Sequence, residues 1–139
     1  MNVTIFGCGR LGSLLAQMLD AEGHKVTVLD TDIEKFERLP ATFNGRKLAG
    51  VGIDVDFLRR AGLAEADAFL ALSGDDRAGG DNTNVMASQI AKKVFGTPLV
   101  ISQIKDPLRG DAYHTFGIET VCPTTIGADL ILKMIGSEP

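Results

Sequence analysis

The first twelve residues place a glycine-rich turn between a short apolar run and a run of helix-forming residues. The apolar run is Val3–Phe6, and the helix-forming residues begin at Ser13. The turn between them reads Gly7, Cys8, Gly9, Arg10, Leu11 and Gly12, which is the spacing G-x-G-x-x-G. In this spacing the first glycine permits a tight turn, the second admits a pyrophosphate to the backbone, and the third lets the helix pack closely on the strand. Phosphates would lie at the helix N-terminus, where free N–H groups and the helix dipole favour negative charge.

An acidic residue after the second expected strand strengthens this prediction. With 16 glycines in 139 residues, the motif alone arises easily by chance. The strand Lys25–Leu29 is followed by Asp30, 18 residues after Gly12, where a carboxylate can accept hydrogen bonds from adenosine ribose hydroxyls. The same charge repels a 2′-phosphate and favours NAD or another adenine nucleotide over NADP. Alternatively, Asp30 is an N-cap of the next short helix, which Asp32 could equally cap.

Strands and helices alternate along the whole chain, which predicts a doubly wound, Rossmann-like α/β fold. Six parallel strands with right-handed crossovers give the expected order 3-2-1-4-5-6, with helices on both faces and a ligand crevice at the carboxyl ends of strands one and four. Ala41–Phe43 competes for the third strand, and Lys47–Ala49 is preferred. The expected strands are Val3–Phe6, Lys25–Leu29, Lys47–Ala49, Ala66–Leu72, Pro98–Ser102 and Glu119–Val121. The expected helices are Arg10–Glu22, Ile33–Leu39, Val55–Ala61, Thr83–Phe95, Pro107–Phe116 and Thr124–Ile135.

Composition excludes several classes of protein. A chain of 139 residues with 45% hydrophobic and 23% charged residues predicts one folded domain, residues 1–139, with no room for a separate substrate domain. A net charge of −4 without a Lys/Arg cluster argues against a nucleic-acid partner. No apolar run approaches the roughly 20 residues that cross a bilayer, so no direct membrane insertion is expected. Cys8 and Cys122, far apart in sequence, indicate reduced thiols in a cytoplasmic protein.

The loop after the fourth expected strand supplies further polar candidates. Ser73, Gly74 and Asp75 should lie across the crevice from the glycine turn. The acid pair formed by Asp75 and Asp76 is more typical of a solvated turn than of a metal site, so no metal is expected. In the next helix, Asp81 is expected to act as the cap and Asn84 to point inward; within the glycine turn, Arg10 is expected to contact phosphate.

Catalytic machinery is missing from the pattern. His24 lies in a turn far from the carboxyl ends of the strands, and His114 lies on a helix surface. Cys122 is expected to be a small core residue, and no G-K-[ST] follows the glycines. The sequence therefore indicates a binding protein without enzymatic activity. Two alternatives remain open: a small NAD-dependent oxidoreductase subunit, and a structural dimerisation module with a degenerate nucleotide site.

Taken together, these residues resemble the RCK N-terminal domain, also called the TrkA-N domain, of potassium transport systems. The resemblance covers almost the whole chain. It rests on the order and spacing of the glycine turn, Val26–Asp32, Leu58–Leu63 with Ala66–Ala68, Asp75-Asp76, Asn84, Ala91–Lys93, Asp106-Pro107 and Gly117–Pro123.

The resemblance implies a function that the composition of the chain does not indicate. Such domains are cytoplasmic, form homodimers or larger rings, bind NAD(H) or ADP/ATP, and gate a membrane-embedded potassium transporter or channel subunit. The chain would then lie at the inner face of the cell membrane through its transporter partner. In the family's pattern the three motif glycines and Arg10 match phosphate-binding positions, and Asp30 matches the ribose position. The expected cofactor-binding residues are Gly7, Cys8, Gly9, Arg10, Leu11, Gly12, Asp30, Thr31, Val51, Ser73, Gly74 and Asp75.

Three features depart from the family's pattern. Val51 stands where an acid commonly lies near the adenine, so its side chain cannot accept a hydrogen bond from the adenine amino group. Ser102-Gln103 replaces an alanine-arginine pair, which predicts that a cation is missing at the end of the fifth strand. The sequence ends at Pro139, with no C-terminal RCK domain expected.

Overall fold

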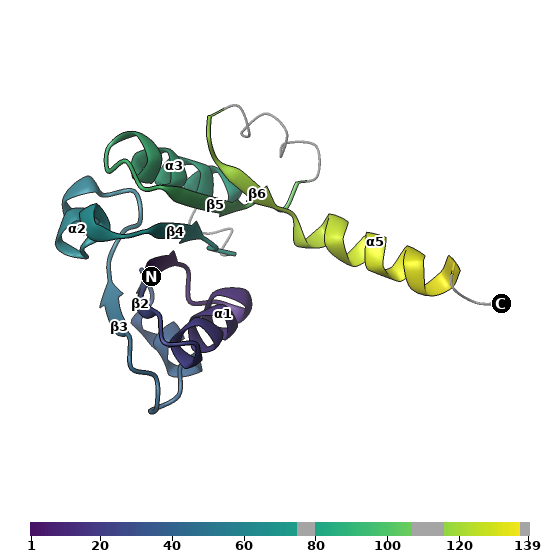
Figure 1. Cartoon of the computed structure of the whole chain (residues 1–139), viewed down its shortest axis with the longest axis horizontal. Coiled ribbons are helices and arrows are strands. Elements are labelled where there is room, and N and C mark those ends of the chain that lie inside the picture. The colour runs from purple at the N-terminus through teal and green to yellow at the C-terminus, as the bar shows by residue number, and fades with distance from the viewer. Residues whose placement is uncertain (75–79, 107–115, 137–139) are drawn as a thin grey trace.

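A six-stranded parallel sheet in the order β3-β2-β1-β4-β5-β6 forms the centre of the molecule (Figure 1). The computed structural model describes residues 1–74, 80–106 and 116–136. The strands are β1 (Asn2–Phe6), β2 (Lys25–Asp30), β3 (Arg46–Ala49), β4 (Ala68–Ala71), β5 (Leu99–Gln103) and β6 (Glu119–Val121). The helices are α1 (Arg10–Ala21), the 3₁₀ helices η1 (Ile33–Arg38) and η2 (Leu63–Glu65), α2 (Val55–Arg60), α3 (Gly80–Lys93) and α5 (Pro123–Gly136). The predicted fold class and strand order are confirmed.

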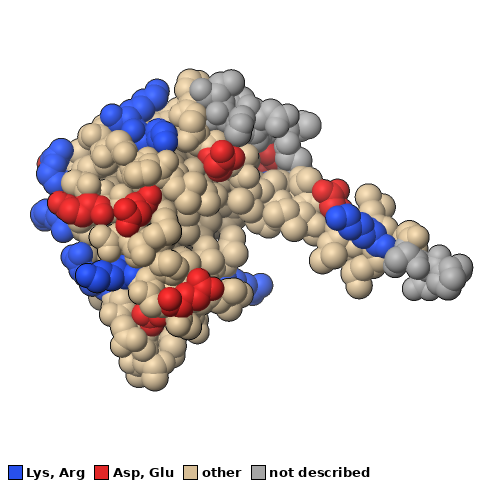
Figure 2. Space-filling view, in the orientation of Figure 1, with Lys and Arg blue, Asp and Glu red and all other residues tan. Residues whose placement is uncertain are grey.

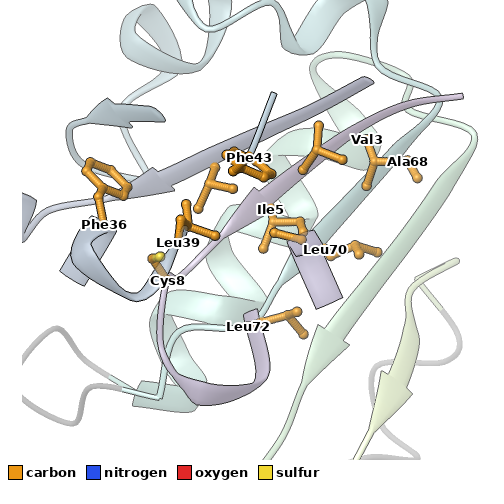
Figure 3. Close-up of a cluster of buried hydrophobic side chains, with 12 residues drawn as sticks. Val3, Ile5, Cys8, Phe36, Leu39, Phe43, Ala68, Leu70 and Leu72 are labelled. Carbon is orange, nitrogen blue, oxygen red and sulfur yellow. The ribbon is translucent and has the colours of Figure 1, made fainter. Parts of the chain in front are cut away.

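Two hydrophobic layers cover the opposite faces of the sheet, because successive side chains of a strand point to opposite sides. On one face, Val3 and Ile5 of β1 pack with residues of α1 and η1, including Ala16 and Phe36 (Figure 3). On the other face, residues of β1, β2 and β4 pack against α2, η2 and α3. The central strands β1 and β4 are therefore buried on both sides, which explains their nearly continuous apolar sequences.

Several predicted boundaries differ from the observed ones for local reasons. β4 begins at Ala68 rather than Ala66, because the N–H of Ala66 donates to the carbonyl oxygen of Leu63 and closes the η2 turn. α3 begins at Gly80, three residues before the predicted start, and ends at Lys93 rather than Phe95. Of the helix predicted over Pro107–Phe116, residues 107–115 lie outside the described part of the chain.

The last helix, α5, projects away from the sheet (Figure 1). None of its described residues is buried, so α5 does not contribute to the helical layers that cover the sheet. Six large apolar side chains of α5 are between 56% and 66% exposed: Ile126, Leu130, Ile131, Leu132, Met134 and Ile135. Figure 2 shows that α5 carries few charged side chains; in sequence these are Asp129 and Lys133. Neither α5 nor any other helix within the described ranges is long and apolar enough to cross a bilayer.

The two cysteines occupy opposite environments. Cys8 is completely buried beneath the glycine turn, and burial followed by the nearby charge of Asp30 raises the pKa of its thiol. Cys122 is half-buried at the junction of β6 and α5, and its predicted role as a core residue does not match that exposure. The hydroxyl of Thr125 lies 3.3 Å from its sulfur, and this hydrogen bond, followed by one from the Thr125 backbone, lowers the pKa of the Cys122 thiol.

This difference predicts selective alkylation of the native protein. Iodoacetamide should modify Cys122 alone, at a lower pH than an ordinary cysteine requires, because the thiolate is the reacting species and the pKa of this thiol is lowered. Mass spectrometry of tryptic peptides measures the site, and Cys122→Ser should remove the reaction. Modification of Cys8 at a comparable rate in the folded protein would contradict the burial described above.

Candidate functional site

The glycine turn is held against two neighbouring strands at the carboxyl edge of the sheet. Gly7 has φ of +110°, which favours glycine, and its N–H donates to the carbonyl oxygen of Leu29 in β2 at 2.7 Å. A Cβ on Gly7 would lie 2.6 Å from the backbone nitrogen of Ser73, just after β4. A Cβ on Gly12 would collide with the carbonyl oxygen of Gly7. Packing therefore requires glycine at both positions.

Gly9 is different, because neither its backbone nor its neighbours require glycine. Its φ of −82° is open to other residues, and a Cβ built on it would meet nothing within 4 Å. Gly9 is also the N-cap of α1, and no side chain caps this helix end. The backbone N–H groups of the first turn are therefore without a capping side chain, next to the open space at Gly9. The positive end of the helix dipole lies at this same terminus. This is an arrangement that suits a phosphate group.

Asp30 ties the glycine turn to the end of β2. Its carboxylate is 5% exposed and accepts hydrogen bonds from the backbone N–H of Cys8 at 2.8 Å and of Asp32 at 2.9 Å. The side chain of Asp32 accepts from the N–H of Glu34 and caps η1, which was one of the two predicted capping arrangements. Cys8 is a residue of the turn with no exposed surface, so its side chain contributes to the site by packing beneath the backbone of the turn.

Asn84 joins the ends of β4 and β5. It is completely buried on α3, as the sequence predicted, and its Oδ1 accepts from the N–H of Ser73 at 2.9 Å. Its Nδ2 donates to the carbonyl oxygens of Ser73 at 2.8 Å and Gln103 at 3.2 Å. Asn84 therefore pairs three backbone groups, two of Ser73 just after β4 and one of Gln103 at the end of β5, and holds these two strand ends together.

Asp81 does not cap α3, contrary to the prediction. It lies inside the first turn, and its carboxylate accepts from the backbone N–H groups of Lys105 at 2.8 Å and Asp106 at 3.1 Å. The ammonium of Lys105 in turn donates to the carbonyl oxygen of Gly74 at 2.7 Å. The loops after β4 and β5 are thus linked, and the helix-capping rule failed because the partner of Asp81 is 24 residues away.

A cleft of about 680 Å³ lies over these loops. Its walls come from the glycine turn, from η1, from the loops after β4 and β5, and from the first residue of α5. The lining residues are Gly9, Arg10, Leu11, Lys35, Arg38, Leu72, Gly74, Gln103, Lys105 and Pro123. Among the described residues that line the cleft, four are cations and none is a carboxylate, so this part of the lining favours an anionic ligand.

Only part of the predicted site lines this cleft. Gly9, Arg10, Leu11 and Gly74 do so, whereas Ser73 is buried beside Asn84. Thr31 and Val51 are exposed after β2 and β3 but are not among the lining residues. Asp75 and Asp76 lie outside the described residues, as does His114. In the portions of the chain that are described, no group of three or more His, Cys, Asp or Glu could hold a metal ion.

Three lining cations were missed by sequence reasoning. Lys105 lies two residues after Gln103, so the expected lack of a cation after the fifth strand is wrong for the cleft. Lys35 and Arg38 belong to η1, whose three-residue period places them on one face. The signal was the i, i+3 spacing of these two cations directly after the acid-bearing strand, which places them on one face of either a 3₁₀ helix or an α-helix.

The fold defines an α/β domain of Rossmann-like architecture. The family model of the TrkA-N domain matches residues 3–124 of the sequence, so the chain belongs to this family. The domains of this family are regulatory and generally non-catalytic.

Curated relatives agree with this assignment. The chain is 44% identical over 142 residues to the Trk system potassium uptake protein TrkA of Streptomyces coelicolor, covering 100% of this chain and 61% of the relative. It is 30% identical to a TrkA homolog of Pyrococcus horikoshii, covering 97% of the chain and 60% of the relative. The chain thus spans about three fifths of the length of these relatives.

Solved structures share the fold at low sequence identity. The TrkA-N domain of the inner membrane protein ybaL from Escherichia coli superposes with a TM-score of 0.78 at 18% identity, covering 96% of this chain and 95% of that one. The AMP-bound Kef C-terminal domain of Shewanella denitrificans gives 0.76 at 20% identity, covering 99% and 83%. The NAD-bound GsuK channel gives 0.70 at 21% identity, covering 88% and 21%.

The position of Asn84 predicts a large stability effect. Asn84→Ala should lower the free energy of unfolding by about 2–4 kcal/mol, because it leaves buried backbone groups of Ser73 and Gln103 unpaired. Urea denaturation followed by circular dichroism measures this change. Met86→Ala, on the exposed side of the same helix, should stay within about 1 kcal/mol of the parent. Equal effects of the two substitutions would contradict the role assigned to Asn84.

Proposed function

We propose that this chain is the nucleotide-sensing regulatory unit of a potassium uptake system. The observation that carries the proposal is the open space at Gly9, beside the uncapped N-terminus of α1 and within a cleft lined by four cations. Because neither packing nor backbone conformation requires glycine there, a ligand that fills the space explains its presence. The TrkA relatives supply the link to potassium uptake.

The proposed ligand is NAD(H) or ADP/ATP. All of these contain phosphates, and the presence of Arg10 and the first turn of α1 in the lining of the cleft supports a diphosphate position there. Structural relatives described as bound to NAD, ADP and AMP support an adenine nucleotide. Within this chain, Asp30 is proposed to orient the ribose, and the exposed Val51 to lie near the base.

The cleft is proposed to communicate with α5. Pro123 lines the cleft and is also the first residue of α5, so a ligand that fills this end of the cleft contacts the base of the helix. The segment before it is held by the N–H of Ile104, which donates to Val121 at 2.9 Å, and by the Cys122 thiol, 3.7 Å from the carbonyl oxygen of Lys105. Ligands that differ in their contacts there would favour different orientations of α5.

A second copy of the chain is the proposed partner of α5. This helix is apolar around most of its circumference, a pattern typical of helices that are buried. Homodimerisation, or assembly into a larger ring, would remove this surface from water. The assembly is proposed to act on a membrane-embedded potassium transporter subunit from the cytoplasmic side. A ligand preference of 1–3 kcal/mol between two arrangements changes their ratio by about 5- to 150-fold.

Substitution of Gly9 tests the nucleotide site. Gly9→Ala should abolish or strongly weaken nucleotide binding and lower the stability by no more than about 1 kcal/mol, the scale of an N-cap effect, because the added methyl group meets no protein atom within 4 Å. Thermal unfolding with NAD⁺, NADH, ADP, ATP and AMP measures this, since a ligand at a hundredfold excess over Kd adds about 2.7 kcal/mol of stability. Gly127→Ala, also in open space but on α5, is the matched control and should bind normally. If no nucleotide stabilises the parent chain, the sensor proposal fails; turnover of a nicotinamide cofactor with a small substrate would favour an oxidoreductase instead.

Charge substitutions on α5 test the proposed assembly. Leu130→Glu with Met134→Glu places two carboxylates one turn apart on the exposed apolar surface and should shift the chain from dimer to monomer. Light scattering after size-exclusion chromatography measures the mass. The control is Lys133→Glu, which changes charge at a position that is already polar and should keep the parent's mass. A parent chain that is monomeric at all accessible concentrations would refute an α5-mediated dimer.

A further inference from the structure

Two cations extend the cleft beyond the glycine turn. Lys35 and Arg38 are three positions apart in η1, and a 3₁₀ helix places residues three apart above one another. Both line the cleft that also contains Gly9 and Arg10. The helix η1 follows closely after Asp30, the last residue of β2. In Rossmann-like folds this strand end binds the ribose, so Lys35 and Arg38 lie just beyond the ribose position.

The backbone beneath this pair is held in place. The thiol of Cys8 donates to the carbonyl oxygen of Lys35 at 3.3 Å, and the amide of Gln17 lies 3.4 Å from the carbonyl oxygen of Arg38. Phe36, between the two cations, is buried in the core. The positions of both Cα atoms are therefore fixed relative to α1, which reduces the entropy lost when their side chains hold a ligand.

Three acidic side chains of the same segment do not line the cleft. Asp32, Glu34 and Glu37 line a second hollow together with Lys35 and Arg38, so the two cations border both spaces and the three acids border only the second. Asp30, the nearest acid to the glycine turn, is 5% exposed, and both of its oxygens accept backbone hydrogen bonds. Its repulsion of an anion in the cleft is reduced by these two N–H dipoles.

We propose that Lys35 and Arg38 form a subsite for a phosphomonoester carried by an adenine nucleotide, in addition to the diphosphate position at Gly9–Leu11. The inference rests on the proposed nucleotide function and adds a specificity to it. A phosphomonoester carries about −1.5 to −2 charges at neutral pH and three acceptor oxygens, which suits a guanidinium and an ammonium on one face. Two sources offer this chemistry: the 2′-phosphate of NADP(H), and the terminal phosphate of ATP.

Paired ligands and a double variant test the subsite. Each pair differs by one phosphate group: NADP⁺ against NAD⁺, and ATP against ADP. Isothermal titration calorimetry on the parent chain should give at least one pair in which the extra phosphate improves affinity roughly tenfold. Lys35→Gln with Arg38→Gln should abolish that preference, so that the affinity for the ligand with the extra phosphate falls about tenfold more than the affinity for the ligand without it. The pair whose preference disappears identifies the source of the phosphate.

The control removes the same charge elsewhere. Lys25→Gln with Arg60→Gln takes two cations from the start of β2 and the end of α2, neither of which lines the cleft. This variant should keep the parent's preference. Equal affinities within both ligand pairs for the parent, or an equal loss in both double variants, would overturn the subsite and leave the nucleotide proposal standing. If the parent binds none of the four ligands, both proposals fail.

Discussion

The close approach of Gly7 to the neighbouring strands is the contact on which the rest of the site depends. Its N–H is bonded to β2, and its Cα lies against the backbone just after β4, so the turn sits directly above the junction of three strands. Asp30 then secures the turn on the β2 side, and Asn84 secures the β4 end to β5. Any side chain at Gly7 would push this edge apart and displace the N-terminus of α1 with it.

These supporting bonds also determine the charge that a ligand meets. The carboxylates of Asp30, Asp32 and Asp81 each accept backbone N–H groups, so they serve the loops around the cleft and do not line it. The side chains that do line it include four cations, although the chain as a whole has a net charge of −4. A positive cleft on a negative protein concentrates small anions locally and disfavours larger polyanions such as nucleic acid.

The sequence was sufficient for the strand order, because alternating strands and helices with right-handed crossovers leave few arrangements. The inward direction of Asn84 and the cap at Asp32 were also predictable from local pattern. The acceptor role of Asp81 was not, since its partners lie 24 and 25 residues away. Nor was the direction of α5, because an apolar period reveals that a helix has a surface to bury and not where that surface lies. Lys35 and Arg38 were missed because their i, i+3 spacing places them on one face of a short helix but does not show that this face borders the cleft.

Because α5 projects away from the sheet, a small rotation at its first residue moves its far end by a larger distance. Its 14 residues at 1.5 Å per residue make an arm of about 21 Å, so a rotation of about 10° at Pro123 would displace the far end by about 4 Å. Rearrangement within the cleft needs to move a side chain by only a fraction of that distance. A rigid arm attached to the rim of a small cleft therefore enlarges a local displacement without requiring any strand of the sheet to move.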